Sequence, residues 1–466
     1  MQRAWSRIEA ITAPRELPRS SPQRSDRSAL QKPGARPAVC RLIDDRVRFP
    51  ERVNGPVGMD AIRCLSQARQ SHVSGITLDF SGVRRAYPEG MMQVVSHVDH
   101  LRREGMHFDV IPPSHKGLAG VFEACNWAHF MSPAVHNPSS YRGDAQLPVL
   151  RFTTSGEQKK VVDQAMEVAL HQMRLPRAHL TGLEWALNEI SDNVLNHAEA
   201  PAGGLMQVLT FQEQQRVQFV VADDGRGIFA SMREGYPHLR GDREAIGEAI
   251  RKGVTRNSRV GQGNGLAGAL RIAGYGGGTF LIASQTGELY VGPTTNGRGY
   301  GPRLEPRGGA RTFFGTFVFV EIRTDSPLDL ALALNYGQAA DDTWDYLDGM
   351  LGEGKEFNVV VAEEAVGFGS RGAGRALRNK LNNLLGADDK AVVNIDWGGI
   401  TMVSSSFADE AIGKLFAELG PLTFAGRVHN RNIEPIVGDL INQAIMQRAA
   451  QETHLARHSG ARTPRT

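Results

Sequence analysis

The sequence contains little cysteine, few aromatic residues and no long apolar run. Its three cysteines, Cys40, Cys64 and Cys125, are scattered, odd in number and without the spacing of metal ligands. This pattern excludes a disulfide-stapled secreted domain and favours free thiols in a reducing cytoplasm. No stretch approaches the roughly 18 consecutive apolar residues of a membrane-spanning helix. We therefore expect a cytoplasmic protein with no membrane partner.

The chain also lacks a strong net charge, since its formal charge is only +3. Residues 1–36 and 451–466 carry +5 and +2, which leaves −4 for the rest of the chain. A basic surface for nucleic acid is therefore expected only in these two tails, which we predict to be disordered. A transit peptide and an over-extended start are two further interpretations of residues 1–36.

The length of 466 residues, with 41% hydrophobic and 22% charged residues, predicts a globular protein of two to four domains. Composition and periodicity predict a mixed α/β chain. The predicted order is a basic tail (1–36), a small domain (37–140), a central domain (148–325), a linker (326–354), a second small domain (355–450) and a second tail (451–466).

The segment Leu187–Ala198 is the first candidate for chemistry, because as a helix it has an apolar face beside a polar one. The apolar face is formed by Leu183, Leu187, Ile190 and Val194. The polar face is formed by Glu189, Asn193, Asn196 and His197. An amide oxygen of Asn193 suits Mg²⁺, and the Glu189 carboxylate suits a general base acting on water or an alcohol. A solvated surface face is the alternative for this segment taken alone.

Two glycine-rich loops add to this candidate. Asp223-Asp224-Gly225-Arg226-Gly227-Ile228 follows a predicted strand with Val217, Phe219 and Val221 on one face. Glycines there allow the backbone to approach a flat ligand, and a buried carboxylate can accept from an exocyclic amine. Gly261-Gln262-Gly263-Asn264-Gly265-Leu266 precedes a predicted helix, an arrangement that suits phosphate binding. Each loop alone is also typical of an ordinary turn.

In this order and spacing, the three segments resemble the GHKL ATP-binding family of gyrase B, ninety-kilodalton heat-shock chaperones, histidine kinases and MutL. Residues 150–325 carry the resemblance, which implies a central α/β sandwich of the Bergerat type that binds ATP and Mg²⁺. It implies that Glu189 is catalytic, that Asn193 binds Mg²⁺ and that Asp223 binds the adenine amine. The implied ATP-binding residues are Asn193, Asp223, Gly225, Gly227, Ile228, Gly261, Gly263, Gly265, Leu266 and Thr316.

Two segments next to these motifs, the one around His171 and Phe229–Val260, can be interpreted in more than one way. His171 lies in a segment that imitates a histidine-kinase phosphoacceptor box, but it ends the helix directly before Glu189, so we interpret it as a structural histidine. The long segment Phe229–Val260 is expected to be a lid over the nucleotide. Its candidate phosphate contacts, of which several are expected to be plain surface charges, are Arg251, Lys252, Arg256 and Arg259.

The two small domains contain a related pattern. Asp79-Phe80-Ser81-Gly82-Val83 corresponds to Asp396-Trp397-Gly398-Gly399-Ile400, and Pro88–Met91 corresponds to Ser405–Ala408. A strand, this turn and a small-residue helix start resemble STAS and STAS-like modules, with the N-terminal copy degenerate. In that family a serine at the helix start can be phosphorylated, which makes Ser404, Ser405 and Ser406 possible phosphosites. A serine N-cap is the alternative.

The combined resemblance implies an intracellular signalling protein. We expect a GHKL-type ATPase or protein serine kinase that acts through STAS-like modules on a STAS-like or sigma-like protein partner, with a homodimer as an open alternative. A nucleotide-gated binding module with little turnover is the second hypothesis. A topoisomerase- or MutL-like machine is disfavoured, because the segment after residue 325 is an acidic linker and not a second DNA-processing domain. A histidine kinase is disfavoured because a dimerisation hairpin is lacking.

Overall fold

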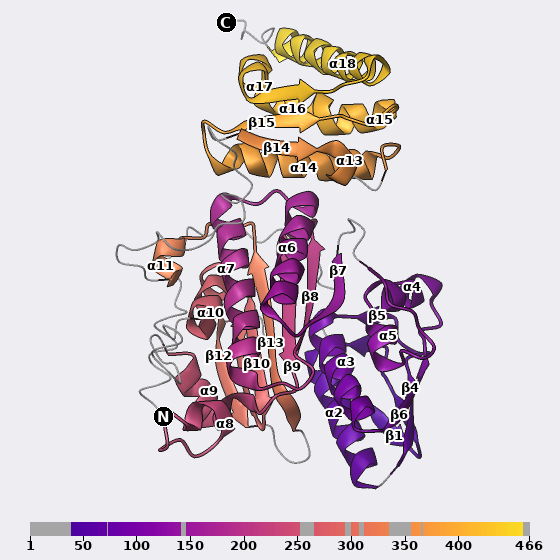
Figure 1. Ribbon diagram of the computed structural model, residues 1–466, viewed down its shortest axis with the longest axis vertical. Helices are drawn as coiled ribbons and strands as arrows, with labels where there is room; N and C mark the ends of the chain where they lie inside the picture. The colour runs from indigo at the N-terminus through magenta and orange to yellow at the C-terminus, as the bar shows by residue number, and fades with distance from the viewer. Residues whose placement is uncertain are drawn as a thin grey trace, which may run out of the picture.

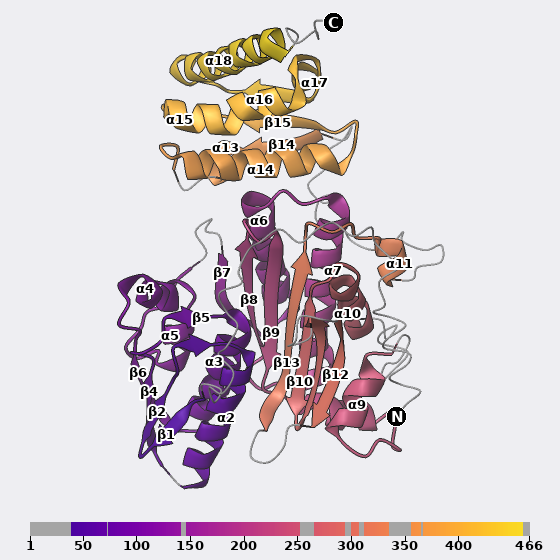
Figure 2. The same ribbon diagram turned by 180° about the vertical axis from the view of Figure 1, so that it is seen from behind.

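The protein is a mixed α/β protein with several sheets, arranged in three parts (Figure 1). The computed structural model describes residues 39–71, 73–140, 146–251, 265–293, 300–306, 312–334, 356–364 and 367–459. The central part contains the largest sheet. The N-terminal part lies beside that sheet, and the C-terminal part is stacked on one end of it, as the reverse view also shows (Figure 2). Within the described residues no helix is long and apolar enough to span a bilayer.

The N-terminal part has a four-stranded sheet in the order β1-β2-β4-β6. Its elements are β1 (Arg41–Ile43), β2 (Arg46–Arg48), β3 (Arg52–Val53), α2 (Gly55–Gln70), β4 (Gly75–Asp79), β5 (Arg85–Ala86), α3 (Pro88–Arg103), β6 (His107–Ile111), α4 (Lys116–Ala124) and α5 (Trp127–Met131). Helices α2 and α3 touch at two glycines, because a Cβ on Gly58 would lie 2.6 Å from the carbonyl oxygen of Gly90. Larger residues at this crossing would separate the helices.

The central part is a seven-stranded sheet in the order β12-β11-β10-β13-β9-β8-β7, in which every neighbouring pair is antiparallel. Its strands are β7 (Gln146–Phe152), β8 (Gly204–Phe211), β9 (Arg216–Asp223), β10 (Thr279–Gln285), β11 (Gly287–Pro293), β12 (Tyr300–Pro306) and β13 (Phe313–Arg323). Its helices are α6 (Ser155–Gln172), α7 (Arg177–Asn193), α8 (Gly227–Arg233), α9 (Asp242–Ala249), α10 (Gly265–Tyr275) and α11 (Leu330–Leu334).

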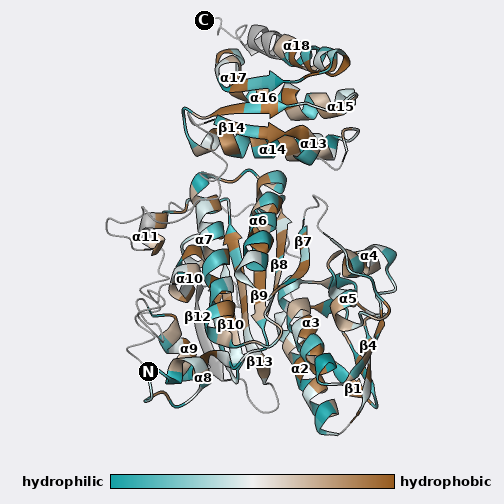
Figure 3. Cartoon of the chain, in the orientation of Figure 1, coloured by the Kyte–Doolittle hydropathy of each residue, from teal (hydrophilic) through white to brown (hydrophobic). Residues whose placement is uncertain are grey.

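Strands β8, β9 and β10 of the central sheet are buried on both faces, which their hydropathy reflects (Figure 3). Alternate residues of a strand point to opposite faces, so one strand supplies two cores. On β9, Val217, Phe219 and Val221 face the helices α6, α7 and α10, as their spacing predicted. Val220 and Ala222 instead belong to the apolar core of the N-terminal part. The N-terminal part therefore packs on the other face of the sheet at β7, β8, β9, β10 and β13, with helix α3 against β9 and β13.

Two boundaries in and after the central part differ from the sequence-based prediction. Helix α7 changes into a π-helical turn at Val194–Ala198, and the extra residue in this turn interrupts the helical periodicity that placed Asn196 and His197 beside Asn193.

The predicted linker, 326–354, contains helix α11 near its start. Leu328 and Leu334 are buried there, because Gly182 of α7 and Gly268 of α10 leave room for leucine side chains.

The C-terminal part has a three-stranded parallel sheet, β14-β15-β16. Its elements are β14 (Glu356–Val360), α13 (Val361–Glu364), α14 (Arg371–Ala387), β15 (Val392–Asp396), α15 (Ser405–Ala408), a π-helical turn (Asp409–Gly413), α16 (Lys414–Leu419), α17 (Pro421–Arg427), β16 (Val428–Arg431) and α18 (Pro435–Ser459). The prediction of a disordered tail from residue 451 is wrong up to Ser459. Good helix formers continue α18 there, and residues 451–459 contain no glycine or proline.

Helix α14 attaches the C-terminal part to the loop between α6 and α7. The buried side chain of Asn383 accepts from the backbone N–H of Leu175 at 2.9 Å and donates to the carbonyls of Leu170 and Met173 at 3.0 and 2.9 Å. Asn379 donates to the carbonyl of His171 at 3.1 Å. Two asparagines thus satisfy backbone groups that a loop buried between two parts would otherwise leave unpaired.

The two small parts share their local hydrogen bonds as well as their sequence pattern. Asp79 Oδ1 accepts from the N–H of Ser81 at 3.0 Å, and Asp396 Oδ1 accepts from that of Gly398 at 2.8 Å. The aromatic residue that follows each aspartate is fully buried. Its N–H donates to the last residue of the next parallel strand, from Phe80 to Ile111 and from Trp397 to Arg431. The matching sequence stretches therefore form matching turns.

Candidate functional site

Helices α7 and α10 meet at Glu189, Asn193 and Gly265. A Cβ on Gly265 would lie 2.6 Å from Glu189 Oε2 and 3.6 Å from Asn193 Nδ2, so the start of α10 lies directly against both side chains. Burial and, secondly, the nearby charge of Asp192 raise the pKa of Glu189 to about 7. A carboxyl group with this pKa can exchange a proton near neutral pH, which is what a general base requires. The structure thus brings the Glu189 helix and the end of the second glycine loop together.

Asp223 lies at the end of β9 and connects two backbone segments, its own loop and strand β13. Its Oδ1 accepts from the N–H of Gly225 at 2.9 Å and from that of Thr316 at 3.2 Å. Gly315 has a φ of +74° and packs so closely on Asp223 that a side chain would collide with it. Burial raises the pKa of Asp223 to about 7, and the adjacent charge of Asp224 adds to this effect, whereas the two N–H donors lower it. A buried carboxyl at the edge of a glycine-lined loop can recognise a hydrogen-bond donor of a ligand.

Ser284 of β10 belongs to the same site and was missed from the sequence. Its buried hydroxyl accepts from the N–H of Ile228 at 2.9 Å and donates to the carbonyl of Gly315 at 3.0 Å. Gly227, with a φ of +78°, leaves the space that this hydroxyl occupies. The only signal in the sequence is one serine in an otherwise apolar strand, which is too common to identify a site.

The first glycine loop is also joined to the end of α7. The N–H of Arg226 donates to the carbonyl of Ala198 at 2.9 Å, and any side chain at Gly225 would collide with that carbonyl. Arg226 Nε donates to the carbonyl of His197 at 3.2 Å. The π-helical turn therefore presents its carbonyls to the loop that begins at Asp223. Asn196, predicted on the polar face, is exposed and outside these contacts.

Other predicted residues either lie outside this cluster or fall outside the described residues. Gly261 and Gly263 lie outside the described residues, as do Lys252, Arg256 and Arg259 of the predicted lid. Leu266 is half-buried in the first turn of α10, and Ile228 is buried in the core on the helix side of the sheet. Arg251 forms an ion pair with Glu248 at 2.7 Å. The described part of the lid consists of α8 and α9, which cover the end of β10 and β11.

The side chains around Glu189 are of the types that a nucleotide with Mg²⁺ would require. Asn193 Nδ2 is buried and has no hydrogen-bond partner among the described residues, so this N–H donor is left for an acceptor such as a phosphate oxygen. Mg²⁺ prefers oxygen ligands and keeps several waters, so one amide oxygen and substrate phosphates suffice. The amide beside the Glu189 carboxyl and the start of α10 supplies a donor set of this kind.

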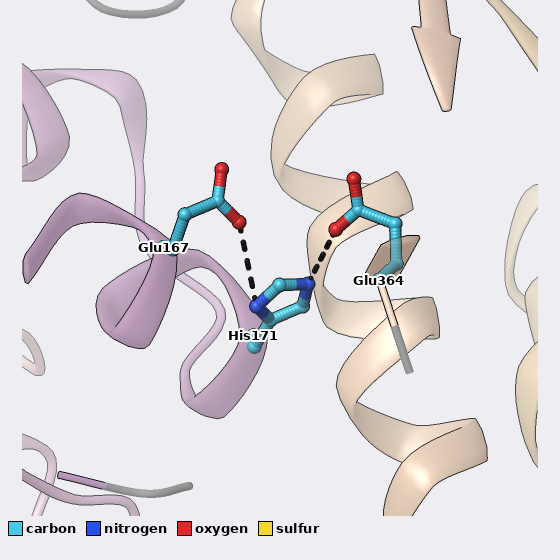
Figure 4. A group of neighbouring side chains, drawn as sticks. All are labelled: Glu167, His171 and Glu364. Atoms are coloured by element: carbon cyan, nitrogen blue, oxygen red, sulfur yellow. Dashed lines mark hydrogen bonds and ion pairs between the residues drawn. The ribbon is translucent and has the colours of Figure 1, made fainter. Parts of the chain in front are cut away.

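A second titratable cluster joins the central and C-terminal parts (Figure 4). His171 Nε2 lies 2.8 Å from Glu364 Oε2, and His171 Nδ1 lies 3.5 Å from Glu167 Oε2. These three residues have the geometry of a metal site. However, the buried ammonium of Lys380 lies 2.7 to 3.1 Å from all four carboxylate oxygens and already supplies the cation. His171 is itself buried in this ion-pair network, which agrees with a structural histidine.

The predicted phosphosites begin helix α15. Ser404 is the N-cap, since its hydroxyl accepts from the N–H of Phe407 at 3.0 Å. The hydroxyls of Ser404 and Ser406 lie 3.0 Å apart, and Ser405 is exposed. Figure 1 shows α15 in the C-terminal part, separated from α10 by helix α14 and the α6–α7 hairpin. These serines are therefore remote from Glu189 within one chain.

The C-terminal part matches a known family of domains. Residues 373–437, from α14 to the start of α18, match the family model described as a STAS-like domain of unknown function (DUF4325). This match covers the aspartate–aromatic turn at Asp396 and the start of α15, and it confirms the STAS-like prediction for the C-terminal part. No curated protein and no solved structure matches the chain.

Proposed function

We propose that the central part is an ATP-binding domain of the GHKL type, acting as an ATPase or a protein serine kinase, and that STAS-like modules connect it to a protein partner. The observation that carries the proposal is the convergence of Asp223 with Gly225 and Thr316. One carboxylate oxygen accepts from both backbone N–H groups, so residues far apart in sequence form one pocket edge. The seven-stranded antiparallel sheet with helices α6, α7 and α10 on one face supports the same assignment.

Each residue has a distinct role in this proposal. Asp223 accepts a hydrogen bond from the adenine amine, and Gly225, Gly227 and Thr316 allow the backbone to approach the base. Asn193 holds Mg²⁺, which when bound neutralises charge on the phosphates. Glu189 takes the proton from the attacking water or hydroxyl, because its pKa of about 7 leaves a large deprotonated fraction at neutral pH.

The flanking parts are proposed to be the regulatory modules. The match at residues 373–437 supports this role for the C-terminal part, and the shared turns at Asp79 and Asp396 support a second, degenerate STAS-like module at the N-terminus. Because α15 is remote from Glu189, a serine-kinase activity would act on a serine of another molecule. Ser404, Ser405 and Ser406 of a second copy and a serine of a separate STAS-like partner are the two possible acceptors.

Incubation of the full chain with γ-labelled ATP and Mg²⁺ tests the proposal. Release of labelled phosphate indicates an ATPase, and label on protein indicates a kinase. Binding without either product indicates the alternative, a nucleotide-gated binding module. Calorimetry on wild type and Asp223→Asn tests whether Asp223 contacts the base. A site whose polar group is hydrogen-bonded to a ligand loses affinity for that ligand when the group is changed. We expect at least a tenfold loss for both ATP and ADP, and equal affinity for the two proteins would reject Asp223 as the base contact.

A further inference from the structure

The last turns of helix α3, in the N-terminal part, contact residues on both sides of the pocket edge at Asp223. His97, His100 and Arg103 are spaced three residues apart and therefore lie on one helix face. This face meets Asp224, which directly follows Asp223, and Phe314, which directly precedes Gly315. A single helix from a different part of the fold thus holds both backbone segments that Asp223 joins.

The contact with Asp224 is a partly buried ion pair. Asp224 Oδ2 lies 2.6 Å from Arg103 Nη2 and 3.0 Å from His100 Nδ1, and its side chain is only 8% exposed. Burial alone would raise the pKa of Asp224, but the hydrogen bonds from His100 and Arg103 outweigh it and lower the pKa to about 2. Asp224 is therefore held as a carboxylate in one position. Its neighbour Asp223 keeps its orientation through the same stretch of backbone.

The contact with Phe314 is aromatic. The Phe314 ring centroid lies 4.2 Å from that of His100 and 4.8 Å from that of His97, nearly parallel to the latter. The Arg69 guanidinium of α2 lies 5.5 Å from the same ring. A surface hollow of about 380 Å³ borders Phe314, His97 and Arg69, so the ring has room to move if these contacts change. A movement of Phe314 would shift Gly315 and the Thr316 N–H that donates to Asp223.

We propose that Arg103 and His100 are positioning residues for the base end of the nucleotide site, so that the docking of the N-terminal part on the sheet sets the affinity for nucleotide. This inference rests on the function proposed above. It assigns the regulation of that site to α3, through Asp224 and Phe314. Without Arg103, the Asp224 charge would be less well neutralised beside Asp223, and the loop that carries both residues would be released.

The test is a double-mutant cycle on the full chain, with Arg103→Ala, Asp224→Asn and both together, measured by calorimetry with ATP and ADP. We expect Arg103→Ala to lower the affinity for both ATP and ADP about tenfold, because the affected contact is to the base, which the two nucleotides share. Adding it to Asp224→Asn should produce little further loss, since the two side chains act through each other. Arg103→Lys should restore part of the affinity. At saturating ATP, any turnover should stay within about twofold of wild type.

Arg102→Ala is the matched control. Arg102 lies on the same turn and binds Asp99 at 3.0 Å. Within the described part of the chain Asp224 is bound by His100 and Arg103 and not by Arg102, so the loss of Arg102 should leave nucleotide affinity unchanged. Equal losses for Arg102→Ala and Arg103→Ala, or additive losses in the cycle, would assign Arg103 a general structural role and overturn the inference. Wild-type affinity in Arg103→Ala would also overturn it. A wild-type chain that binds no nucleotide would instead reject the proposed function, and this inference with it.

Hydrogen exchange provides a second readout that does not depend on how well the variants fold. In the wild-type chain, ADP should slow amide exchange in the last turn of α3 as well as at Gly315 and Thr316. Protection at Gly315 and Thr316 without any change in α3 would show that the helix does not sense the pocket.

Discussion

Gly265 and Glu189 are in direct contact: a methyl group on Gly265 would lie 2.6 Å from the Glu189 carboxylate. Glu189 is the proposed base and Gly265 begins the helix after the second glycine loop, so the contact joins the proposed catalytic segment to the proposed phosphate-binding segment. Only hydrogen at this position allows the two helices to approach so closely.

Gly265→Ala should therefore displace the Glu189 side chain while the fold survives, since the colliding atom is the end of a flexible side chain. We expect turnover to fall at least tenfold, and the unfolding midpoint to change little. Gly156→Ala, in the first turn of α6, is a matched control, because its added methyl would meet no atom within 4 Å. Equal turnover in both variants would show that the Gly265 contact has no bearing on catalysis.

Glu189→Gln should bind ATP as well as wild type and lose turnover by a factor on the order of 10²–10⁴, the usual contribution of a general base. Because the pKa of Glu189 is raised to about 7, the active deprotonated form should increase as the pH rises through 7. Turnover of the wild type should therefore rise over about pH 6 to 8 and then level off. Wild-type turnover that is absent, or equal to that of Glu189→Gln, would support the nucleotide-gated binding module.

Asn193→Ala should remove the Mg²⁺-dependent part of ATP binding and leave metal-free nucleotide binding partly intact. The reason is that Mg²⁺ would lose its protein oxygen ligand while the base contact at Asp223 remains. Calorimetry in the presence of Mg²⁺ and in the presence of EDTA measures the affinity for ATP of the wild type and of Asn193→Ala. If EDTA lowers the affinity of wild type no more than that of the variant, Asn193 is not a metal ligand.

Asp223 should make stability depend on pH. Its pKa is raised from 3.8 to about 7, so between these values the folded chain holds a proton that the unfolded chain has released. The free energy of unfolding should therefore fall as the pH rises through this window, by at most on the order of 4 kcal/mol. The Asp223→Asn variant has no carboxyl group at this position, so its free energy of unfolding should not show this decrease with pH. Urea unfolding at pH 5 and pH 8 should show that the variant gains stability relative to wild type at the higher pH, and a pH-independent difference would contradict the assignment.

Lys380→Met should weaken the attachment of the C-terminal part. It removes the ammonium that lies 3.0 Å from Glu167 and 2.7 Å from Glu364, and breaking such a buried pair typically costs about 3–5 kcal/mol. Faster amide exchange in α14 and a lower thermal midpoint are the expected results. Lys414→Met is the control: Lys414 is partly exposed, and its partner Glu410 is also bound by Arg378, so the change should be small.

The cluster of Glu167, His171, Glu364 and Lys380 can be tested for metal binding. Since the Lys380 ammonium already binds all four carboxylate oxygens of Glu167 and Glu364, neither EDTA nor added Zn²⁺ should change the thermal midpoint of the wild-type chain. A midpoint that rises with Zn²⁺ in the wild type and not in His171→Ala would show that a metal can displace the lysine.

Local features of this protein could be predicted from the sequence because they depend on neighbouring residues. Alternation along residues 217–221 predicted which side chains of β9 share a face, and the aspartate–aromatic–x–glycine pattern predicted two similar turns at Asp79 and Asp396. The helix that carries Glu189 followed from its apolar period, and the sequence also identified Asp223 and Gly265 as candidates. The π-helical turn at Val194 was not predictable in this way, because one extra residue in a turn leaves no mark on composition.

Tertiary structure alone decided which distant residues meet. The N–H of Thr316 reaches Asp223 because β13 pairs with β9, and Ser284 reaches Gly315 because β10 pairs with β13. The contact of Arg103 with Asp224 requires the N-terminal part to cover the second face of the central sheet, and that of Lys380 with Glu167 requires α14 to dock on α6. Strand order, register and docking depend on the complementary shapes of whole surfaces, and this information is spread over residues far apart in the chain.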